Sequence, residues 1–173
     1  DTTNPMPELA GLIAVTKRLL ALPVSLTTPG QRAFWETFLK KLPPLPTREV
    51  AGMPAFAPAT RFDAKRNIES PELYCVFPFR LASFNRPNAP RAIAALDHRW
   101  DKGSNGWRQD DIFMAFLGLT DQARDHLVRR ARSHDPGSRF PAFWGPNYDW
   151  IPDQDHGGVL MKAFQAMVMQ TEP

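Results

Sequence analysis

Prolines divide this chain into segments whose apolar residues recur at helical spacing. There are 18 of them in 173 residues, and several end or open a predicted helix. Apolar residues follow Pro7 with the period of a helix of about four turns. A second helix is predicted after Thr28, because Thr28–Gln31 reads as a capping box with proline at the first helical position. We expect this helix to end at Pro43-Pro44.

The rest of the chain continues the helical pattern. A long irregular connection is expected over residues 45–70, where prolines are frequent and periodic residues are few. Tyr74–Phe77 fits either an extended segment or a short helical turn, since Pro71 and Pro78 bracket it. No strand pattern is convincing, so we predict an all-α fold with long Pro-rich loops. The further helices are expected at residues 90–99, 108–119, 121–133 and 158–170.

Composition indicates one globular domain over residues 1–173. Of the residues, 43% are apolar and 23% are charged, which is ordinary for a folded domain with a sizeable core. The net charge is only +3 and the basic residues are scattered, so we predict no nucleic-acid partner. No apolar stretch is long enough for a membrane span, and we predict no membrane partner. Because the chain begins at Asp1 rather than Met, we expect a processed or truncated product.

Cysteine and histidine usage argues against a disulfide, a metal centre or a bound cofactor. Cys75 is the single cysteine and lies in an apolar run, which favours a buried structural thiol over a nucleophile. The four histidines show none of the spacings that bind metals. We therefore predict neither a metal site nor a cofactor.

Residues 139–158 form the segment richest in potential site residues. Pro, Gly, Asn and Asp exclude a regular helix or strand, yet the segment also carries Trp144, Tyr148 and Trp150. One interpretation is an ordered loop at the mouth of a cleft. The alternative is a surface loop whose aromatic residues cap a helical core.

Carboxylates are the main candidates for chemistry. Asp110 and Asp111 lie in the first turn of a predicted helix, where they can simply complement the helix dipole. Asp153 and Asp155 differ, because they lie beside Trp150 and His156, just before a glycine pair. Paired carboxylates among aromatic residues are typical of glycoside hydrolysis, in which one carboxyl protonates the leaving oxygen and the other activates water.

The order of these segments resembles the C-terminal half of the catalytic domain of glycoside hydrolase family 95, the inverting α-L-fucosidases and related enzymes. The similarity covers roughly residues 9–170. It is carried by three stretches of this chain, which are ESPELYCVFP at 69–78, NGW at 105–107 and DQDHGG at 153–158, the last followed by FQAMVMQ at 164–170.

The resemblance implies roles for individual residues. The catalytic base of the family falls on Asp155 or Asp153, with Asp155 the first choice because it is closer to the glycines. Glu69 and Glu72 stand where the family has two histidines that line the sugar site, so a glycoside other than a fucoside is plausible. Together with the aromatic residues and the histidine of the 139–158 segment, they complete the substrate-binding set that we predict for the carbohydrate, which is Glu69, Glu72, Trp107, Trp144, Tyr148, Trp150 and His156.

The family also implies a fold and a missing part. Its catalytic domain is an (α/α)6 barrel, and its general acid lies upstream of the region matched here. We therefore expect a portion of such a barrel, completed by a second polypeptide or by a missing N-terminal part, and inactive alone. The family suggests secretion or the periplasm.

Two other classes of function remain open from the sequence. One is a non-catalytic carbohydrate-binding or scaffolding helical module, and the other is a helical protein-interaction domain with no role in sugar chemistry.

Overall fold

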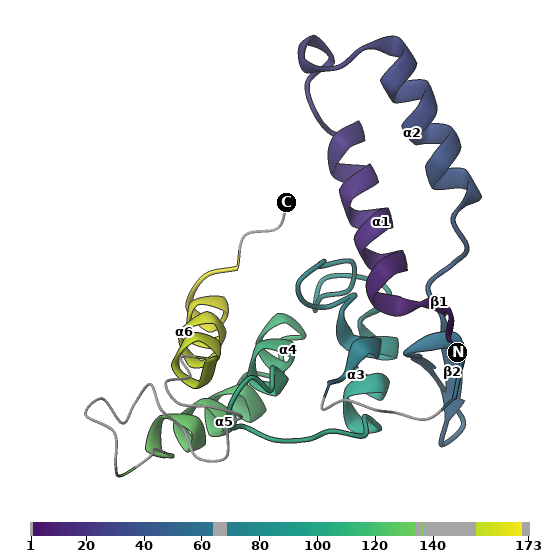
Figure 1. Cartoon of the computed structure of the whole chain (residues 1–173). Coiled ribbons are helices and arrows are strands. Elements are labelled where there is room, and N and C mark those ends of the chain that lie inside the picture. Colours follow the sequence, from purple (N-terminus) through teal and green to yellow (C-terminus); the bar gives the residue numbers. More distant parts are fainter. Residues whose placement is uncertain (1, 64–68, 134–135, 137–154, 171–173) are drawn as a thin grey trace.

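The computed structural model describes residues 2–63, 69–133, 136 and 155–170. Within these ranges it contains six α-helices and two small antiparallel sheets, so the expected all-α fold and the (α/α)6 barrel portion are wrong. Figure 1 shows α1 and α2 as a hairpin that projects from a body formed by the other elements. The elements are β1 (Thr2–Pro5), α1 (Met6–Leu20), α2 (Pro29–Lys41), β2 (Thr47–Val50), β3 (Met53–Phe56), β4 (Ala59–Phe62), α3 (Ala89–Asp97), α4 (Asp110–Phe116), α5 (Thr120–Arg132) and α6 (Asp155–Val168), with the short 3-10 helices η1 (Val24–Leu26) and η2 (Pro71–Leu73).

The strands lie mainly in the segment that we expected to be an irregular connection. β2 and β3 form a hairpin in which Thr47 pairs with Phe56 and Val50 pairs with Met53. Its two-residue turn, Ala51-Gly52, has positive φ at both positions, as a type I′ turn requires. β4 pairs with β1 across the start of the chain. Strands of only four residues carry too little alternation for the sequence to reveal them, and β1 and β3 also contain proline.

The first two helices confirm the local signals in the sequence. The Thr28 hydroxyl accepts a hydrogen bond from the Gln31 amide at 3.2 Å, and the Gln31 side chain accepts one from the Thr28 amide at 2.8 Å. This is the predicted capping box. α2 then ends at Lys41, just before Pro43-Pro44.

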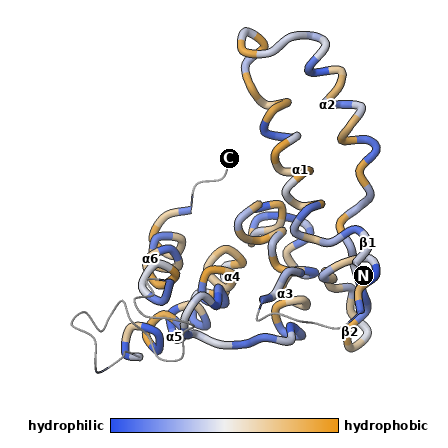
Figure 2. Tube along the Cα trace, in the orientation of Figure 1, coloured by the Kyte–Doolittle hydropathy of each residue, from blue (hydrophilic) through white to orange (hydrophobic). Residues whose placement is uncertain are grey.

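The hairpin of α1 and α2 contacts the body mainly through α1. That helix buries Met6, Leu9, Ala10 and Ala14, whereas no residue of α2 is buried. Arg32 of α2 donates hydrogen bonds to the carbonyls of Leu20 and Leu22 at 2.7 and 3.3 Å, which joins the two helices at the end of α1. Figure 2 shows hydrophobic and hydrophilic residues alternating along both helices.

The core lies where α3, η2 and α4 meet. It contains the buried side chains of Leu73, Val76, Leu96 and Ile112. Cys75 is also buried here, and burial raises the pKa of its thiol far above the usual range. The thiol is therefore protonated and structural, as the sequence predicted.

Two buried ion pairs connect the elements around this core. The Arg99 guanidinium binds both carboxylate oxygens of Asp110, at 3.0 and 2.6 Å. The Arg130 guanidinium of α5 binds Asp111 of α4 at 2.8 and 3.3 Å, and both side chains are fully buried. Asp110 and Asp111 lie in the first turn of α4, as the sequence predicted, and they also neutralise two buried arginines.

Among the described residues, no helix is long and apolar enough to cross a membrane.

Removing one member of the buried pair should destabilise the protein strongly. In Asp111→Ala the Arg130 charge stays buried without its carboxylate, which typically costs about 3–5 kcal/mol of unfolding free energy. Urea denaturation followed by circular dichroism measures this loss. Asp121→Ala is the matched control, because Asp121 forms an exposed pair with Arg124 at 3.2 Å, and we expect no measurable change there. Equal effects of the two substitutions would contradict the structural role of Arg130.

Candidate functional site

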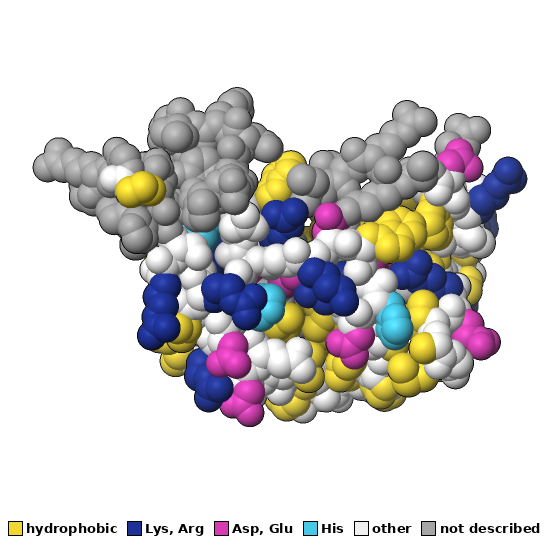
Figure 3. Space-filling model, turned by 90° about the horizontal axis from the view of Figure 1, so that it is seen from below, with side chains coloured by type: hydrophobic (Ala, Val, Ile, Leu, Met, Phe, Trp, Pro, Cys, Tyr) yellow, Lys and Arg dark blue, Asp and Glu magenta, His cyan; other side chains and the backbone are white. Residues whose placement is uncertain are grey.

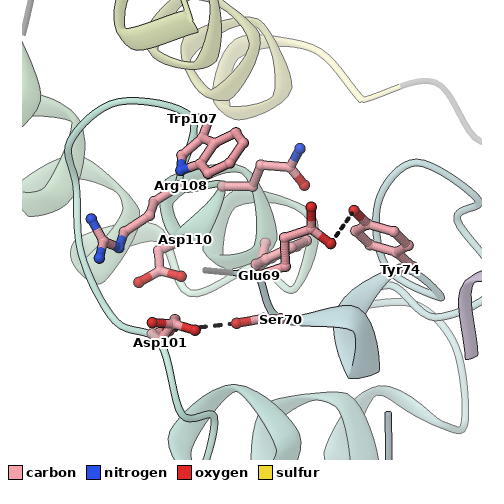
Figure 4. A pocket seen from close by; sticks show the side chains of 9 residues that line it. Glu69, Ser70, Tyr74, Asp101, Trp107, Arg108 and Asp110 are labelled. Carbon is pink, nitrogen blue, oxygen red and sulfur yellow. Dashed lines mark hydrogen bonds between the residues drawn. The ribbon is translucent and has the colours of Figure 1, made fainter. Parts of the chain in front are cut away.

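An open pocket lies between the start of η2 and the loop that joins α3 to α4. It holds about 460 Å³ of empty space, counting its open mouth. Glu69 and Ser70 lead into η2, Tyr74 follows it, and Trp107 belongs to the α3–α4 loop (Figure 4). The full lining among the described residues is Glu69, Ser70, Tyr74, Asp101, Trp107, Arg108, Gln109, Asp110 and Phe113.

One wall of the pocket is organised around Glu69. The Tyr74 hydroxyl donates to a carboxylate oxygen of Glu69 at 3.5 Å. Partial burial and the Glu69 carboxylate raise the pKa of Tyr74 above its ordinary value. The phenol therefore stays protonated at neutral pH and is a donor, while Glu69 is an acceptor. Next to Glu69, the Ser70 hydroxyl donates to the carbonyl of Asp101 in the α3–α4 loop at 3.4 Å, which links the two walls (Figure 4).

The opposite wall is the α3–α4 loop, which hydrogen bonds hold in place. The Gly103 amide donates to the Asp110 carboxylate at 2.7 Å, and Arg108 donates to the Asn105 side chain at 2.9 Å. A Cβ atom at Gly103 would come within 2.7 Å of the Arg108 side chain, so glycine leaves the room that this arginine occupies. The loop thus presents Trp107 and Arg108 from a fixed backbone.

His156 binds the same loop from the interior of the protein. Its Nδ1 accepts a hydrogen bond from the Gly106 amide at 3.3 Å, and its Nε2 lies 2.9 Å from the Arg130 carbonyl. These partners fit a neutral ring with the proton on Nε2. The side chain is fully buried, and burial lowers the pKa of the imidazole. Its position in the interior is that of a structural group rather than a sugar contact.

The predicted site residues fall into three groups. Glu69 and Trp107, far apart in the sequence, line the same pocket. Glu72 lies in η2 with only 1% of its surface exposed, and it is not among the lining residues. Asp155 is exposed and is the first residue of α6, so the helix begins three residues before residue 158, where the sequence predicted its start.

Asp153, Trp144, Tyr148 and Trp150 lie outside the described residues.

The sequence alone did not indicate several of the lining residues, among them Tyr74, Asp101, Arg108 and Gln109. Tyr74 stands out in the sequence only as part of an apolar run. Asp101 and Arg108 flank a stretch rich in Gly, Ser and Asn, and such composition around charged residues is a signal that could have found them.

The described residues offer no group of three His, Cys, Asp or Glu side chains that could hold a metal ion. On the face seen in Figure 3, Lys and Arg side chains are interspersed with Asp, Glu and His rather than gathered in one stripe. That face lacks the continuous positive charge of a nucleic-acid surface.

The pocket combines a half-exposed indole with hydrogen-bonding groups of both kinds. Trp107 has 37% of its surface exposed. The carboxylates of Glu69 and Asp101 can accept from hydroxyl groups, and Arg108 and Gln109 can donate. An apolar ring face next to fixed hydrogen-bond donors and acceptors can bind a polyhydroxylated ring.

We expect the pKa of Tyr74 to depend on Glu69. Glu69→Gln removes the negative charge beside the phenol, so the pKa of Tyr74 should fall but stay above the ordinary value because burial persists. Ultraviolet or NMR titration in a Tyr148→Phe background isolates Tyr74, since the chain has only two tyrosines. Glu49→Gln, an exposed carboxylate on β2, should leave the titration unchanged. An unshifted pKa in Glu69→Gln would rule out the contact.

Acid should destabilise the protein through His156. Its folded-state pKa lies below that of the unfolded chain, so the unfolded state binds more protons in acid and the unfolding free energy should fall from about pH 7 to about pH 5. Urea denaturation across this range measures the slope. Burial lowers the pKa of His126 as well, so a His126→Gln background isolates the share of His156. A stability that is constant or rises towards acid would contradict this account.

Comparison with known proteins leaves the function to be argued from this geometry. No family model matches the chain, and neither a curated protein nor a solved structure matches it. The feature that points to a function is thus the pocket itself, with Glu69 and Trp107 on its walls.

Proposed function

We propose that this chain provides the sugar-binding pocket and the catalytic base of an inverting glycoside hydrolase, which would share site residues with the α-L-fucosidases of family 95 but not their barrel fold. The pocket between Glu69 and Trp107 binds one sugar ring. Asp155, or Asp153 in its place, activates the water that attacks the anomeric carbon.

One observation carries the proposal. The resemblance assigns Glu69 and Trp107 to a sugar site without reference to any structure, and both residues line one pocket. They come from separate segments, one before η2 and the other between α3 and α4. Nothing in the local sequence brings these segments together, so their convergence is independent support.

The chemistry of the pocket fits a sugar better than a charged cofactor. The Trp107 indole offers a flat apolar surface for the C–H face of a pyranose. Glu69 is fixed by Tyr74 and accepts from ring hydroxyls, while Arg108 and Gln109 donate to them. Asp110 contributes little free charge, because Arg99 neutralises it.

One hydrogen bond between sequence neighbours connects the proposed base to the backbone next to Trp107. Asp155 precedes His156, whose ring accepts the Gly106 amide hydrogen bond, and Gly106 precedes Trp107. The start of α6 and the tryptophan are thereby held by one hydrogen bond between their neighbours. Asp155 is also exposed, so water can reach its carboxylate.

The general acid belongs to another polypeptide segment in this proposal. The exposed apolar side chains of α6 offer that segment a surface, with 60% of Met161, 56% of Phe164 and 71% of Val168 accessible. Apolar faces of this kind mark interaction sites more often than free surfaces. We therefore expect the chain alone to bind sugar without hydrolysing a glycoside.

The second candidate is a carbohydrate-binding module without catalysis. It is favoured by one observation, which is that Asp155 is not among the described residues that line the pocket.

Titration calorimetry with L-fucose and a panel of other monosaccharides tests the sugar site. Trp107→Ala should weaken binding about tenfold, because ring stacking contributes about 0.5–1.5 kcal/mol beyond the area that it buries. Trp100→Ala is the matched control, since Trp100 is 48% exposed and does not line the pocket. If no sugar binds, or if both variants weaken binding equally, the proposed pocket is wrong.

Catalysis is tested separately, by combining the chain with the polypeptide that carries the acid. Hydrolysis of an aryl glycoside with inversion at the anomeric carbon, followed by NMR and abolished in Asp155→Asn and Asp153→Asn together, is the expected result. Sugar binding without hydrolysis in that assembly would favour the binding module.

A further inference from the structure

The loop between α1 and α2 carries exposed apolar side chains at the far end of the hairpin. Figure 1 shows this loop as the part of the hairpin most distant from the body. Val24 and Leu26, in η1, expose 72% and 70% of their surfaces, and Leu22 is also exposed. Phe34, in the second turn of α2, is exposed as well. We call residues 19–31 the hairpin tip. The hairpin therefore ends in an apolar surface that the described residues leave uncovered.

The hairpin tip contains no charged residue, and the nearest charges on both sides of it are positive. Lys17 and Arg18 precede the tip in the last turn of α1, and Arg32 follows it in α2. Between Glu8 and Glu36 the sequence contains no Asp or Glu. An apolar end with cations directly behind it complements a surface that is anionic outside and apolar inside.

Helix stabilisation explains the cations but not the lack of acidic residues. Lys17 and Arg18 complement the dipole at the end of α1. The same dipole effect favours an acidic residue in the first turn of α2, yet that turn contains none. The absence of negative charge between the two helices therefore has another reason, and close approach to anionic groups supplies one.

Hydrogen bonds within the hairpin already pair polar backbone groups of the tip. Arg32 donates to the carbonyls of Leu20 and Leu22, and the Leu26 amide donates to the Pro23 carbonyl at 2.9 Å. The capping box pairs two amides at the start of α2. A paired backbone group loses less free energy of hydration when it leaves water. The tip can therefore enter an apolar layer without unfolding.

A lipid surface fits the tip better than a protein partner does. A stable protein interface takes about 20–30 residues from each side, which is more than the tip supplies. The interface of a bilayer accepts a narrow apolar end, and anionic headgroups attract basic residues that lie near it. The prediction of no membrane partner rested on the lack of a spanning stretch, whereas entry into one leaflet needs no span.

We infer that the hairpin tip attaches this protein to an anionic lipid surface. Leu22, Val24 and Leu26 enter the boundary between headgroups and acyl chains, while Lys17 and Arg18 bind the anionic headgroups. The described residues that line the sugar pocket include none of the tip, so the attachment does not depend on the proposed function.

Co-sedimentation of the whole chain with vesicles tests the inference. One set of vesicles is pure phosphatidylcholine, and the other is an equal mixture of phosphatidylcholine and phosphatidylserine. We expect the chain to bind the anionic set about thirtyfold more tightly, because Lys17 and Arg18 each contribute about fivefold near such a surface. The preference should shrink as salt is added.

Two valine variants test the apolar part of the attachment. Val24 and Val168 are exposed to nearly the same extent, at 72% and 71%, and replacing either by Asp adds one negative charge. Val24→Asp should weaken binding to the anionic vesicles about tenfold, because it removes a side chain that enters the lipid. Val168→Asp, in α6, is the matched control and should change the affinity less than about twofold.

Two lysine variants test the charged part. Lys17 and Lys41 are exposed residues of the same hairpin, but Lys41 ends α2, a helix of 13 residues that is about 20 Å long. That length is about twice the screening distance at 0.1 M salt. At this salt concentration Lys17→Gln should weaken binding to the anionic vesicles about fivefold, and Lys41→Gln less than about twofold.

Several results would overturn the inference. If the chain does not bind anionic vesicles at low ionic strength, it is wrong, and a concentration-dependent dimer that Val24→Asp abolishes would then make the tip a contact between two copies. Equal losses in the two valine variants, or in the two lysine variants, would reduce the binding to general attraction between a basic protein and anionic lipid. Equal binding to both sets of vesicles would contradict the role of Lys17 and Arg18.

Discussion

The buried guanidinium of Arg130 is the group on which the C-terminal half of the structure depends. Burying a charge raises the free energy of the folded state unless oxygen atoms of the protein replace the hydrogen bonds that the charge made to water. Here Asp111 supplies both carboxylate oxygens, and the carbonyls of Gly106, Arg108 and His156 supply the rest. These acceptors come from α4, from the loop before it and from α6. One side chain of α5 thereby fixes the other three elements relative to one another.

The hydrogen bonds of Arg130 also fix one wall of the candidate sugar pocket. Trp107 lies between Gly106 and Arg108, and Arg130 binds the carbonyls on both sides of it. His156 adds a hydrogen bond to the Gly106 amide. Because the backbone on both sides of Trp107 is fixed, little conformational entropy is lost when a ring stacks on its indole. The same buried arginine that stabilises the fold therefore also prepares the proposed binding surface.

The sequence by itself determined the features that depend on neighbouring residues. The capping box at Thr28, the end of α2 before its prolines and the apolar face of α1 are all local, so their signals lie within a few residues. The tertiary structure alone decided three features. These are the pairing of β1 with β4, the presence of Glu69 and Trp107 around one pocket, and the arginine partners of Asp110 and Asp111. Each of these needs two segments that are distant in the chain, and a short motif holds no information about which distant group will meet it. Burial is likewise a property of the whole molecule, and it made His156 a structural hydrogen-bonding group where its sequence neighbours indicated a sugar contact.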